Sequence, residues 1–208
     1  MAAASSARGK FITLEGVDGA GKSTHVAWIA ERLRGQGREV VVTREPGGTP
    51  LAEKLRARVL SEAMDPVSET RLMFEARADH VAKVIAPALA RGAWVVCDRF
   101  TDSTLAYQGA GKGVDRALID ELSRKVHPHT RPDLTLVFDA PYEVSSRRLA
   151  ASGRQPDRFE AESQAFFERV RSAYQRIAAT EPDRVRLIDG TKSADQVKVA
   201  IEQIIASI

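Results

Sequence analysis

The sequence predicts a single α/β domain in which helices flank both faces of a five-stranded, doubly wound parallel sheet. Short apolar or β-branched runs alternate with longer segments of helical spacing, which is the pattern of parallel strands connected through helices. The short runs lack a regular alternation of polar and apolar residues, as expected for strands buried on both faces. The 208 residues, 43% of them hydrophobic, suffice for one sizeable core, and no repeat or Pro/Gly-rich linker divides them.

Strands are expected at residues 11–15, 39–43, 94–98, 134–139 and 185–189. Helices are expected between and after them, at residues 23–35, 51–60, 69–91, 115–125, 142–151, 160–179 and 193–205. Turns rich in glycine or proline follow the first three strands, at residues 16–21, 45–48 and 108–113. Because ligands bind beyond the carboxyl ends of the strands in open α/β sheets, we expect these turns to face one crevice.

The turn after the first strand matches the phosphate-binding pattern G-x-x-x-x-G-K-[ST]. Its glycines allow successive backbone N–H groups to point at phosphate oxygens, and the N-terminus of the following helix adds positive potential. Lys22 is expected to reach the β- and γ-phosphates, and Ser23 to ligate Mg²⁺. The pattern therefore predicts a P-loop NTPase fold with a nucleoside triphosphate at nine residues: Gly16, Val17, Asp18, Gly19, Ala20, Gly21, Lys22, Ser23 and Thr24.

Composition narrows the class of P-loop protein. The chain has no asparagine, so it cannot supply the Asn-Lys-x-Asp loop with which GTPases read guanine. No apolar run approaches the 18 residues that a membrane helix needs. The net charge is only +3, and the 23 arginines are scattered without an aromatic-basic stripe, which argues against a nucleic-acid partner. The single cysteine cannot form an intrachain disulfide and favours a reducing compartment.

The third expected strand ends in a carboxylate. Asp98 occupies the usual place of the acid that holds Mg²⁺ through water in P-loop proteins. Capping of the next turn is the alternative role, and the presence of the phosphate loop favours the metal. The neighbouring Cys97 is predicted to be a small buried hydrophobic residue and not a nucleophile.

Four sequence elements together resemble the thymidylate kinase family: Leu14-Glu-Gly-Val-Asp-Gly-Ala-Gly-Lys-Ser-Thr24, Thr43-Arg-Glu-Pro-Gly-Gly48, Asp98-Arg-Phe100 and Ala106-Tyr-Gln-Gly109. Arg131-Pro-Asp-Leu134 and Asp157-Arg-Phe-Glu160 continue the similarity, which runs from about residue 10 to the end of the chain. The resemblance implies transfer of the γ-phosphoryl group of ATP to dTMP, giving dTDP and ADP, with Mg²⁺ as cofactor and dTTP synthesis as the pathway. It also implies a cytoplasmic homodimer that needs neither nucleic acid nor membrane.

The resemblance assigns eight residues to the dTMP site: Asp18, Arg44, Phe74, Arg77, Arg99, Ser103, Thr104 and Gln108. Arg99 would hold the acceptor phosphate and Phe74 would stack on thymine. Taken alone, Phe74 is more typical of a core residue, and Gln108 of a turn. The family usually has an arginine four residues after this phenylalanine, but Ala78 stands there and the arginine is Arg77. Because positions three and four apart share roughly one helix face, Arg77 is the expected substitute.

Residues 151–160 lie between two expected helices and contain glycine, proline and two arginines, which favours a mobile lid over ATP. Some members of the family carry a catalytic arginine in the P-loop, where this chain has Gly19. The similarity is therefore to the bacterial type, in which a lid arginine stabilises charge on the transferring phosphoryl group. Arg158 fits the family pattern more closely than Arg154, although it could instead pair with Asp157 or Glu160. The expected catalytic residues are Lys22, Arg99, Arg154 and Arg158.

Residues 1–9 are small and polar, so we expect a disordered extension and not a signal peptide, with the kinase domain spanning residues 10–208. Two alternative functions stay open. Another nucleoside monophosphate kinase, or a deoxynucleoside kinase, would share the phosphate loop and lid, and a nucleoside kinase would also need a carboxylate such as Glu15 to take a hydroxyl proton. A P-loop regulatory ATPase would instead be stimulated by DNA or RNA.

Overall fold

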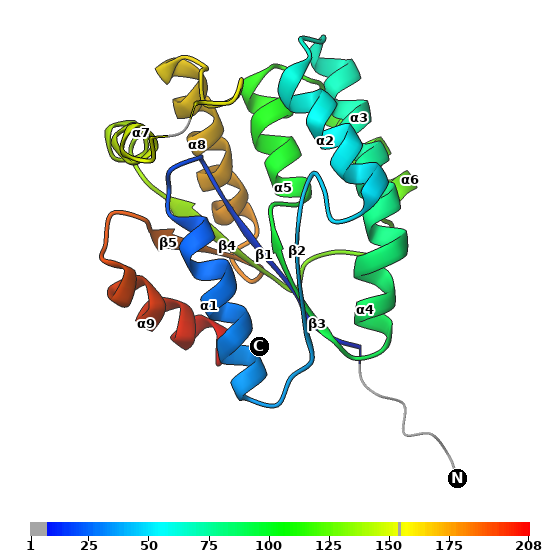
Figure 1. Cartoon of the computed structure of the whole chain (residues 1–208), viewed down its shortest axis with the longest axis vertical. Helices are drawn as coiled ribbons and strands as arrows, with labels where there is room; N and C mark the ends of the chain where they lie inside the picture. The colour runs from blue at the N-terminus through cyan, green and yellow to red at the C-terminus, as the bar shows by residue number, and fades with distance from the viewer. Residues whose placement is uncertain (1–7, 154) are drawn as a thin grey trace.

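One parallel sheet organises the chain, as predicted (Figure 1). The computed structural model describes residues 8–153 and 155–208, so most of the expected N-terminal extension and Arg154 lie outside the described residues. The strand order is β2-β3-β1-β4-β5, and every neighbouring pair is parallel. The strands are β1 (Phe11–Gly16), β2 (Val40–Arg44), β3 (Trp94–Asp98), β4 (Leu134–Asp139) and β5 (Val185–Asp189).

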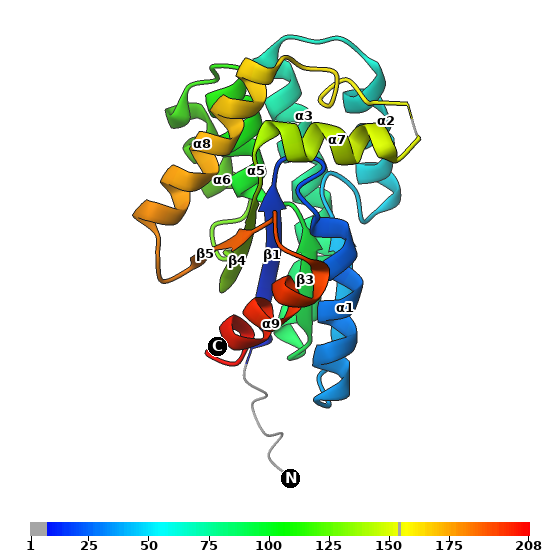
Figure 2. The same cartoon turned by 90° about the vertical axis from the view of Figure 1, so that its left-hand side faces the viewer.

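Helices connect the strands and cover the sheet (Figure 2). The α-helices are α1 (Lys22–Gly35), α2 (Pro50–Ser61), α3 (Pro66–His80), α4 (Ala86–Ala90), α5 (Thr101–Thr104), α6 (Arg116–Val126), α7 (Tyr142–Ala151), α8 (Gln164–Thr180) and α9 (Ala194–Ile205). Two π-helical segments, η1 (Val81–Ile85) and η2 (Leu105–Gly111), continue α3 and α5. Among the described residues, no helix is long and apolar enough to cross a membrane.

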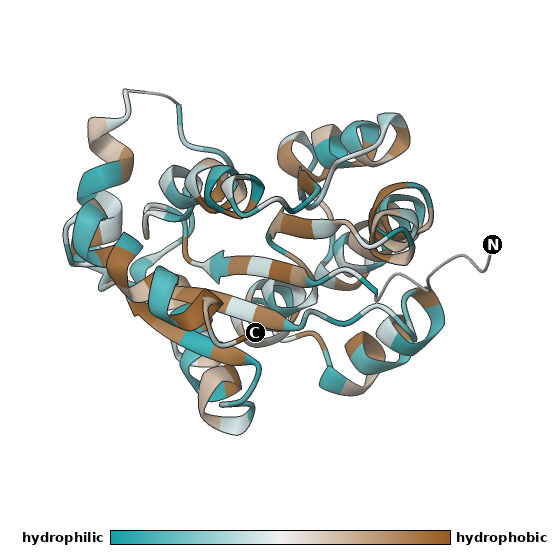
Figure 3. Ribbon diagram, turned by 90° about the horizontal axis from the view of Figure 1, so that it is seen from below, coloured by the Kyte–Doolittle hydropathy of each residue, from teal (hydrophilic) through white to brown (hydrophobic). Residues whose placement is uncertain are grey.

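Both faces of the sheet are covered, which explains why its strands read as unbroken apolar runs. In β3, Val96 belongs to the same core cluster as Ile29 of α1, whereas Val95 packs with Ile85 and Leu89. Successive strand residues point to opposite faces, so α1 covers one face and the η1–α4 segment covers the other. Viewed from below, the mainly hydrophobic strands lie between helices on both sides (Figure 3).

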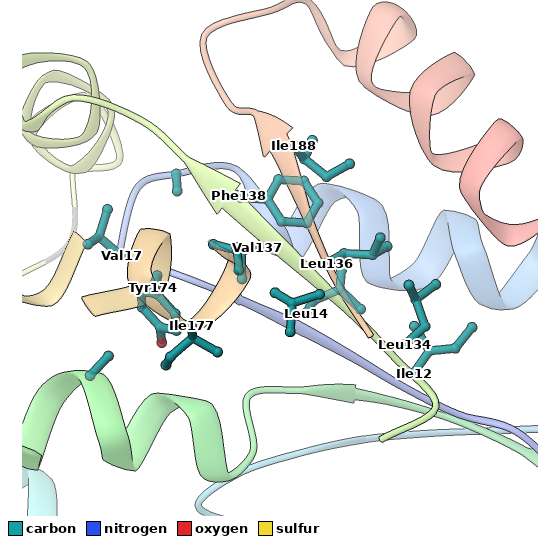
Figure 4. Packing of buried hydrophobic residues seen from close by; sticks show 14 of the residues in the cluster. Ile12, Leu14, Val17, Leu134, Leu136, Val137, Phe138, Tyr174, Ile177 and Ile188 are labelled. Carbon is teal, nitrogen blue, oxygen red and sulfur yellow. The ribbon is translucent and has the colours of Figure 1, made fainter. Parts of the chain in front are cut away.

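The centre of the core lies where β1 and β4 run side by side. Their side chains pack with residues from α8 and β5 in one cluster, which Figure 4 shows: Ile12, Leu14, Leu134, Leu136, Val137, Phe138, Tyr174, Ile177 and Ile188. This packing fixes the carboxyl ends of β1 and β3, the edge at which the phosphate loop and the acceptor cavity are built.

Several expected elements differ from the structure in their bounds, and the differences at α3 and η2 have a clear physical reason. The helix expected at residues 69–91 begins earlier, at Pro66, because the Asp65 side chain accepts hydrogen bonds from the first free N–H groups. The turn expected at residues 108–113 is mostly helical, since η2 extends to Gly111. A Cβ on Gly111 would lie 2.5 Å from the ring of Phe166, so this glycine serves close packing against α8 and not a turn.

Candidate active site

The phosphate loop is the first part of the site. β1 ends at Gly16, and α1 begins at Lys22 directly after the loop. Gly19 has a positive φ of 80°, and a Cβ there would lie 2.4 Å from the carbonyl oxygen of Ser145, so only glycine fits. Residues 16–24 therefore form the strand, loop and helix start on which the phosphate-binding pattern depends.

Lys22 is held inside this loop. Its Nζ donates hydrogen bonds to the carbonyl oxygens of Gly16 and Val17, both at 2.9 Å, and the side chain is buried. Burial, together with the nearby charge of Arg99, lowers the pKa of Lys22 to about 8. The ammonium group is thus positioned by backbone carbonyls at the place where the pattern predicts phosphate oxygens.

Arg99 links the phosphate loop to the neighbouring cavity. It is the residue after β3 and has a φ of 71°, a conformation that is costly for a long side chain and is typical of functional sites. Its guanidinium donates to Asp18 at 2.6 Å and to the carbonyl oxygen of Gly16 at 3.0 Å. Burial opposes ionisation of Asp18, but the charges of Arg99 and Lys22 outweigh it and lower the pKa of Asp18 to about 2. Asp18 is therefore a carboxylate at neutral pH.

Glu15 is linked to Arg99 through two hydroxyl groups that hydrogen-bond to both side chains. Its carboxyl group accepts hydrogen bonds from the Phe100 backbone N–H at 2.7 Å, the Ser103 hydroxyl at 2.5 Å and the Tyr174 hydroxyl at 2.9 Å. Ser103 and Tyr174 in turn accept from Arg99. Burial and the nearby charge of Asp102 raise the pKa of Glu15 to about 7. Glu15 thus acts on the site through its neighbours and orients the end of β3.

A cavity lies beside Arg99, and the empty space in it and at its mouth, which is open to solvent, amounts to about 630 Å³. Its polar lining comes from Asp18, Glu45, Arg56, Arg77, Arg99, Ser103, Thr104, Gln108 and Asp157. Its apolar lining comes from Pro46, Val59, Leu60, Met73, Phe100, Tyr107 and Phe159. Six of the eight residues expected to bind the acceptor therefore line one cavity, next to the phosphate loop.

Arg77 lines this cavity and carries a buried donor that has no partner among the described residues. It forms a buried ion pair with Glu45, with 2.6 Å between Nε and the carboxylate oxygen, and donates to Thr104 at 3.1 Å. The other oxygen of Glu45 bonds to His80, which fixes the carboxylate from behind. Within the described chain the buried Nη1 atom of Arg77 has no partner. A buried donor without a partner is costly, so this atom is suited to a ligand acceptor.

Gln108 presents the complementary acceptor. Its amide Nε2 donates to Glu69 at 2.7 Å, and both side chains are buried. Its Oε1 atom is buried and has no partner among the described residues. Arg77 and Gln108, which carry a buried donor and a buried acceptor without partners in the described chain, therefore both line the same cavity.

Phe74 does not line the cavity, and the adjacent Met73 does. Phe74 packs in a separate cluster with Val114 and Ile119. Each helical residue turns the side chain by about 100°, so Phe74 faces α6 while Met73 faces the cavity. Arg77 lies between these two directions: it lines the cavity, and its guanidinium is 4.7 Å from the centre of the Phe74 ring. The structure thus brings Met73, and not the ring of Phe74, to the wall of the cavity.

His127 packs against the outer side of Phe74, with ring centroids 6.2 Å apart and the planes nearly parallel. Its two ring nitrogens bond to Thr101 and to the carbonyl oxygen of Thr130. Burial, followed by the charge of Arg77, lowers the pKa of His127 to about 4. In the unfolded chain the pKa of His127 has its ordinary value of 6.5, so the unfolded chain binds a proton at this side chain more readily than the folded protein does.

The stability contributed by neutral His127 is therefore complete above about pH 6.5 and is lost as the pH falls toward its folded-state pKa of about 4. We expect the free energy of unfolding to fall across this window by up to ~3 kcal/mol from this group. In His127→Gln, denaturant unfolding should show a shallower slope over the same window. Equal slopes for the two proteins would contradict this account.

Arg44 lies apart from the cavity, and Arg56 takes a place in it. Arg44 is 56% exposed and pairs with Glu53 at 3.0 Å. Arg56 of α2 lines the cavity and donates to the carbonyl oxygen of Pro46. No motif in the sequence marks Arg56, because its place at the cavity depends on the packing of α2 and on the contact with Pro46.

Two residues offer oxygen atoms where the sequence predicts a metal. Asp98 ends β3, and its buried Oδ1 atom has no hydrogen-bond partner in the part of the chain that the structure describes. Ser23 is exposed in the first turn of α1. No group of three or more His, Cys, Asp or Glu side chains that could hold a metal ion by itself occurs among residues 8–153 and 155–208. The substrate would therefore have to supply further ligands.

The expected lid follows α7. A short turn, in which Asp157 accepts from the backbone N–H groups of Phe159 and Glu160, delays the start of α8 to Gln164. Arg158 donates to Glu69 and to the carbonyl oxygen of Val59, so it lies against the walls of the acceptor cavity.

Comparisons with known proteins identify the family of the chain. Residues 14–201 match the family model described as thymidylate kinase. A thymidylate kinase of Cupriavidus metallidurans is 57% identical over 97% of this chain and 100% of its own length. One from Methylobacillus flagellatus is 58% identical over 92% of this chain and 94% of its own.

A solved structure supports the same relationship. The crystal structure of thymidylate kinase from Ehrlichia chaffeensis superposes with a TM-score of 0.78 at 34% identity, covering 96% of this chain and 99% of that one. Family model, relatives and structure extend over nearly the whole chain, including the phosphate loop and the cavity. The chain belongs to the thymidylate kinase family.

Proposed function

We propose that the protein transfers the γ-phosphoryl group of ATP to dTMP, giving dTDP and ADP, as the names of its relatives suggest. One observation supports this acceptor most strongly. Two residues that line the cavity beside the phosphate loop carry buried polar atoms without partners in the described chain, the donor Nη1 of Arg77 and the acceptor Oε1 of Gln108. Thymine carries the matching pair on one edge, the O4 acceptor and the N3–H donor.

The remaining walls suit the same base. Met73 and Phe100 offer apolar surface to the faces of a pyrimidine ring and to a methyl group, which favours thymine over uracil. Thr104 adds a hydroxyl beside Arg77. A ring larger than a pyrimidine would have to displace Gln108 or Arg77, each of which is held by a buried carboxylate.

Arg99 and Asp18 are placed for the acceptor phosphate and sugar. They lie between the base cavity and the loop that would hold ATP, and Arg99 contacts both. A phosphate oxygen of dTMP attacks the γ-phosphorus while the bond to the β–γ bridging oxygen breaks, and ADP leaves with that electron pair. The acceptor is an anion at neutral pH, so the chain needs to hold and align two polyanions and needs no strong base.

The residues at the end of β3 and the start of α1 fit a magnesium ion. Asp98 has a buried carboxylate oxygen without a protein partner, and Ser23 carries an exposed hydroxyl beside the phosphate loop. Hard oxygen ligands of this kind, completed by substrate phosphates, are what Mg²⁺ prefers. When bound, the ion would neutralise charge on the β- and γ-phosphate oxygens.

The lid supplies the proposed arginine that faces the transferring phosphoryl group. Arg158 is held by Glu69 at the acceptor cavity, so it would have to leave that carboxylate to serve there. This contact is suited to a role of Arg158 on the acceptor side, and Arg154, the other arginine of the expected lid, lies outside the described residues. If Arg158 acts on the acceptor, its removal should alter acceptor use more than kcat at saturating dTMP.

We also propose that the protein works as a cytoplasmic homodimer, as the family resemblance implies. The one cysteine, Cys97, is buried at the end of the sheet and forms no disulfide, which is compatible with a reducing compartment.

An assay of ADP release with ATP and Mg²⁺ tests the proposed acceptor. Separate reactions would contain dTMP, dUMP, dCMP, dGMP, UMP, thymidine or single-stranded DNA. We expect strong turnover with dTMP, weaker turnover with dUMP and little with the others. Strong turnover with thymidine or with another monophosphate would reassign the acceptor cavity, and stimulation by DNA alone would overturn the kinase assignment.

A further inference from the structure

Glu69 of α3 is a buried carboxylate that binds donors from two other segments, η2 with the residue after it and the expected lid. Its side chain is fully buried, and it accepts hydrogen bonds from Gln108 Nε2 at 2.7 Å and from Lys112 Nζ at 2.8 Å. Arg158, from the expected lid, donates to the same oxygen as Lys112. Neither the phosphate loop nor the sequence motifs account for an acid at this position.

These contacts determine which way the amide of Gln108 faces. A carboxylate only accepts hydrogen bonds, and that of Glu69 forms ion pairs with Lys112 and Arg158. The amide must therefore turn its NH₂ group toward Glu69. Its oxygen is consequently directed away from Glu69, into the cavity lining, where it is buried without a partner in the described chain.

The guanidinium of Arg77 is also held in one orientation by a buried carboxylate. Arg77 is bound through Nε to the buried carboxylate of Glu45, and that carboxylate is fixed by His80. Arg77 can only donate, so its free Nη1 selects an acceptor. Two buried acids, Glu45 and Glu69, thus orient two residues of one cavity lining: Arg77, which can only donate, and Gln108, whose oxygen is left to accept.

We propose that Glu69 is a specificity-determining positioning residue, which locks the Gln108 amide so that the cavity accepts a pyrimidine with an N3–H group and rejects cytosine. This inference rests on the proposed function. Cytosine presents a lone pair at N3, which would face Gln108 Oε1, and an amino group at position 4, which would face Arg77 Nη1. Buried polar groups left unpaired in this way can give discrimination of ~10⁴-fold or more.

Replacing the carboxylate of Glu69 should allow the Gln108 amide to adopt either orientation. In Glu69→Gln the new amide can either donate or accept, so the Gln108 amide can turn over and offer its NH₂ group to cytosine N3. We expect the ratio of kcat/KM for dTMP to kcat/KM for dCMP to fall ~10- to 100-fold, with the KM for ATP little changed. Glu75→Gln, an exposed change on the same helix, should leave the ratio as in the wild type.

A double-mutant cycle separates positioning from a general structural effect. Gln108→Leu removes the group through which Glu69 would act, so adding Glu69→Gln to it should change the ratio no further. A further fall in the double variant, or an unchanged ratio in Glu69→Gln alone, would overturn the inference. If Glu69→Gln does not fold, Glu69→Asp enters the same cycle, because it keeps the charge and withdraws the carboxylate from Gln108.

Measurements on the wild-type protein show whether a negative result concerns the role of Glu69 or the proposed function on which that role rests. No turnover of dTMP by the wild type would refute the proposed function. Normal turnover of dTMP by the wild type, with the same preference over dCMP retained in Glu69→Gln, would refute only the role of Glu69.

Discussion

Replacement of Lys22 by alanine is expected to lower kcat at least ~10³-fold. The ammonium group is the cation that the phosphate loop holds at its centre, bonded to the carbonyl oxygens of Gly16 and Val17. In the transition state it would face negative charge on the β- and γ-phosphate oxygens in a largely water-free loop, where a lost charge is worth several kcal/mol. Steady-state ADP release with saturating ATP and dTMP measures the effect.

The control for this variant is Lys54→Ala, a lysine on the exposed side of α2 that should leave kcat unchanged. Thermal unfolding of both variants shows whether Lys22→Ala still folds. A folded Lys22→Ala protein with kcat within ~10-fold of the wild type would remove the phosphate loop from the catalytic account.

Replacement of Arg99 by alanine is expected to act mainly on the acceptor. Its guanidinium lies between the loop and the base cavity, bonded to Asp18 and supported by Ser103 and Tyr174. Loss of a buried cation that contacts the acceptor phosphate should lower kcat/KM for dTMP ~10³-fold. The KM for ATP should change ~3-fold or less, because Lys22 and the loop N–H groups remain in place.

Initial rates with each substrate varied in turn measure this difference, and the exposed Arg91→Ala provides a matched control. Arg99 also stabilises the carboxylate of Asp18, so a modest loss of thermal stability is expected. Equal losses for ATP and dTMP would contradict the assignment of Arg99 to the acceptor.

Local patterns predicted the frame of the molecule well. The strand β3 has the predicted bounds, because its apolar run begins just after Gly92 and ends at the charged Asp98, so few other bounds fit it. The phosphate loop could also be predicted from the sequence, because its glycines are required by the backbone conformation of the loop itself. Such features depend on neighbours in the sequence.

Features that depend on contacts between distant parts of the chain could not be predicted from local sequence patterns. Gly109 and Gly111 indicate a turn by composition, yet they lie in a helix that packs closely on Ile119 and Phe166. Tertiary packing overrode the local tendency of glycine to break helices.

The choice between Met73 and Phe74 shows the same limit within the site. Both are apolar, adjacent and on one helix, and only the packing of α3 against α6 decides which side chain enters the cavity. Glu69 likewise gives no signal in the sequence, because its partners Gln108 and Arg158 are distant along the chain and meet it only in the fold.

The central claim is that the phosphoryl group passes from ATP to the phosphate of dTMP. The most direct test is one reaction that contains ATP labelled on the γ-phosphate, Mg²⁺ and equal amounts of dTMP, dUMP, dCMP and thymidine, with the products separated by anion exchange. The account predicts that most of the label appears in dTDP, with a minor share in dUDP. Label found chiefly as inorganic phosphate, or on dCMP or thymidine, would contradict it.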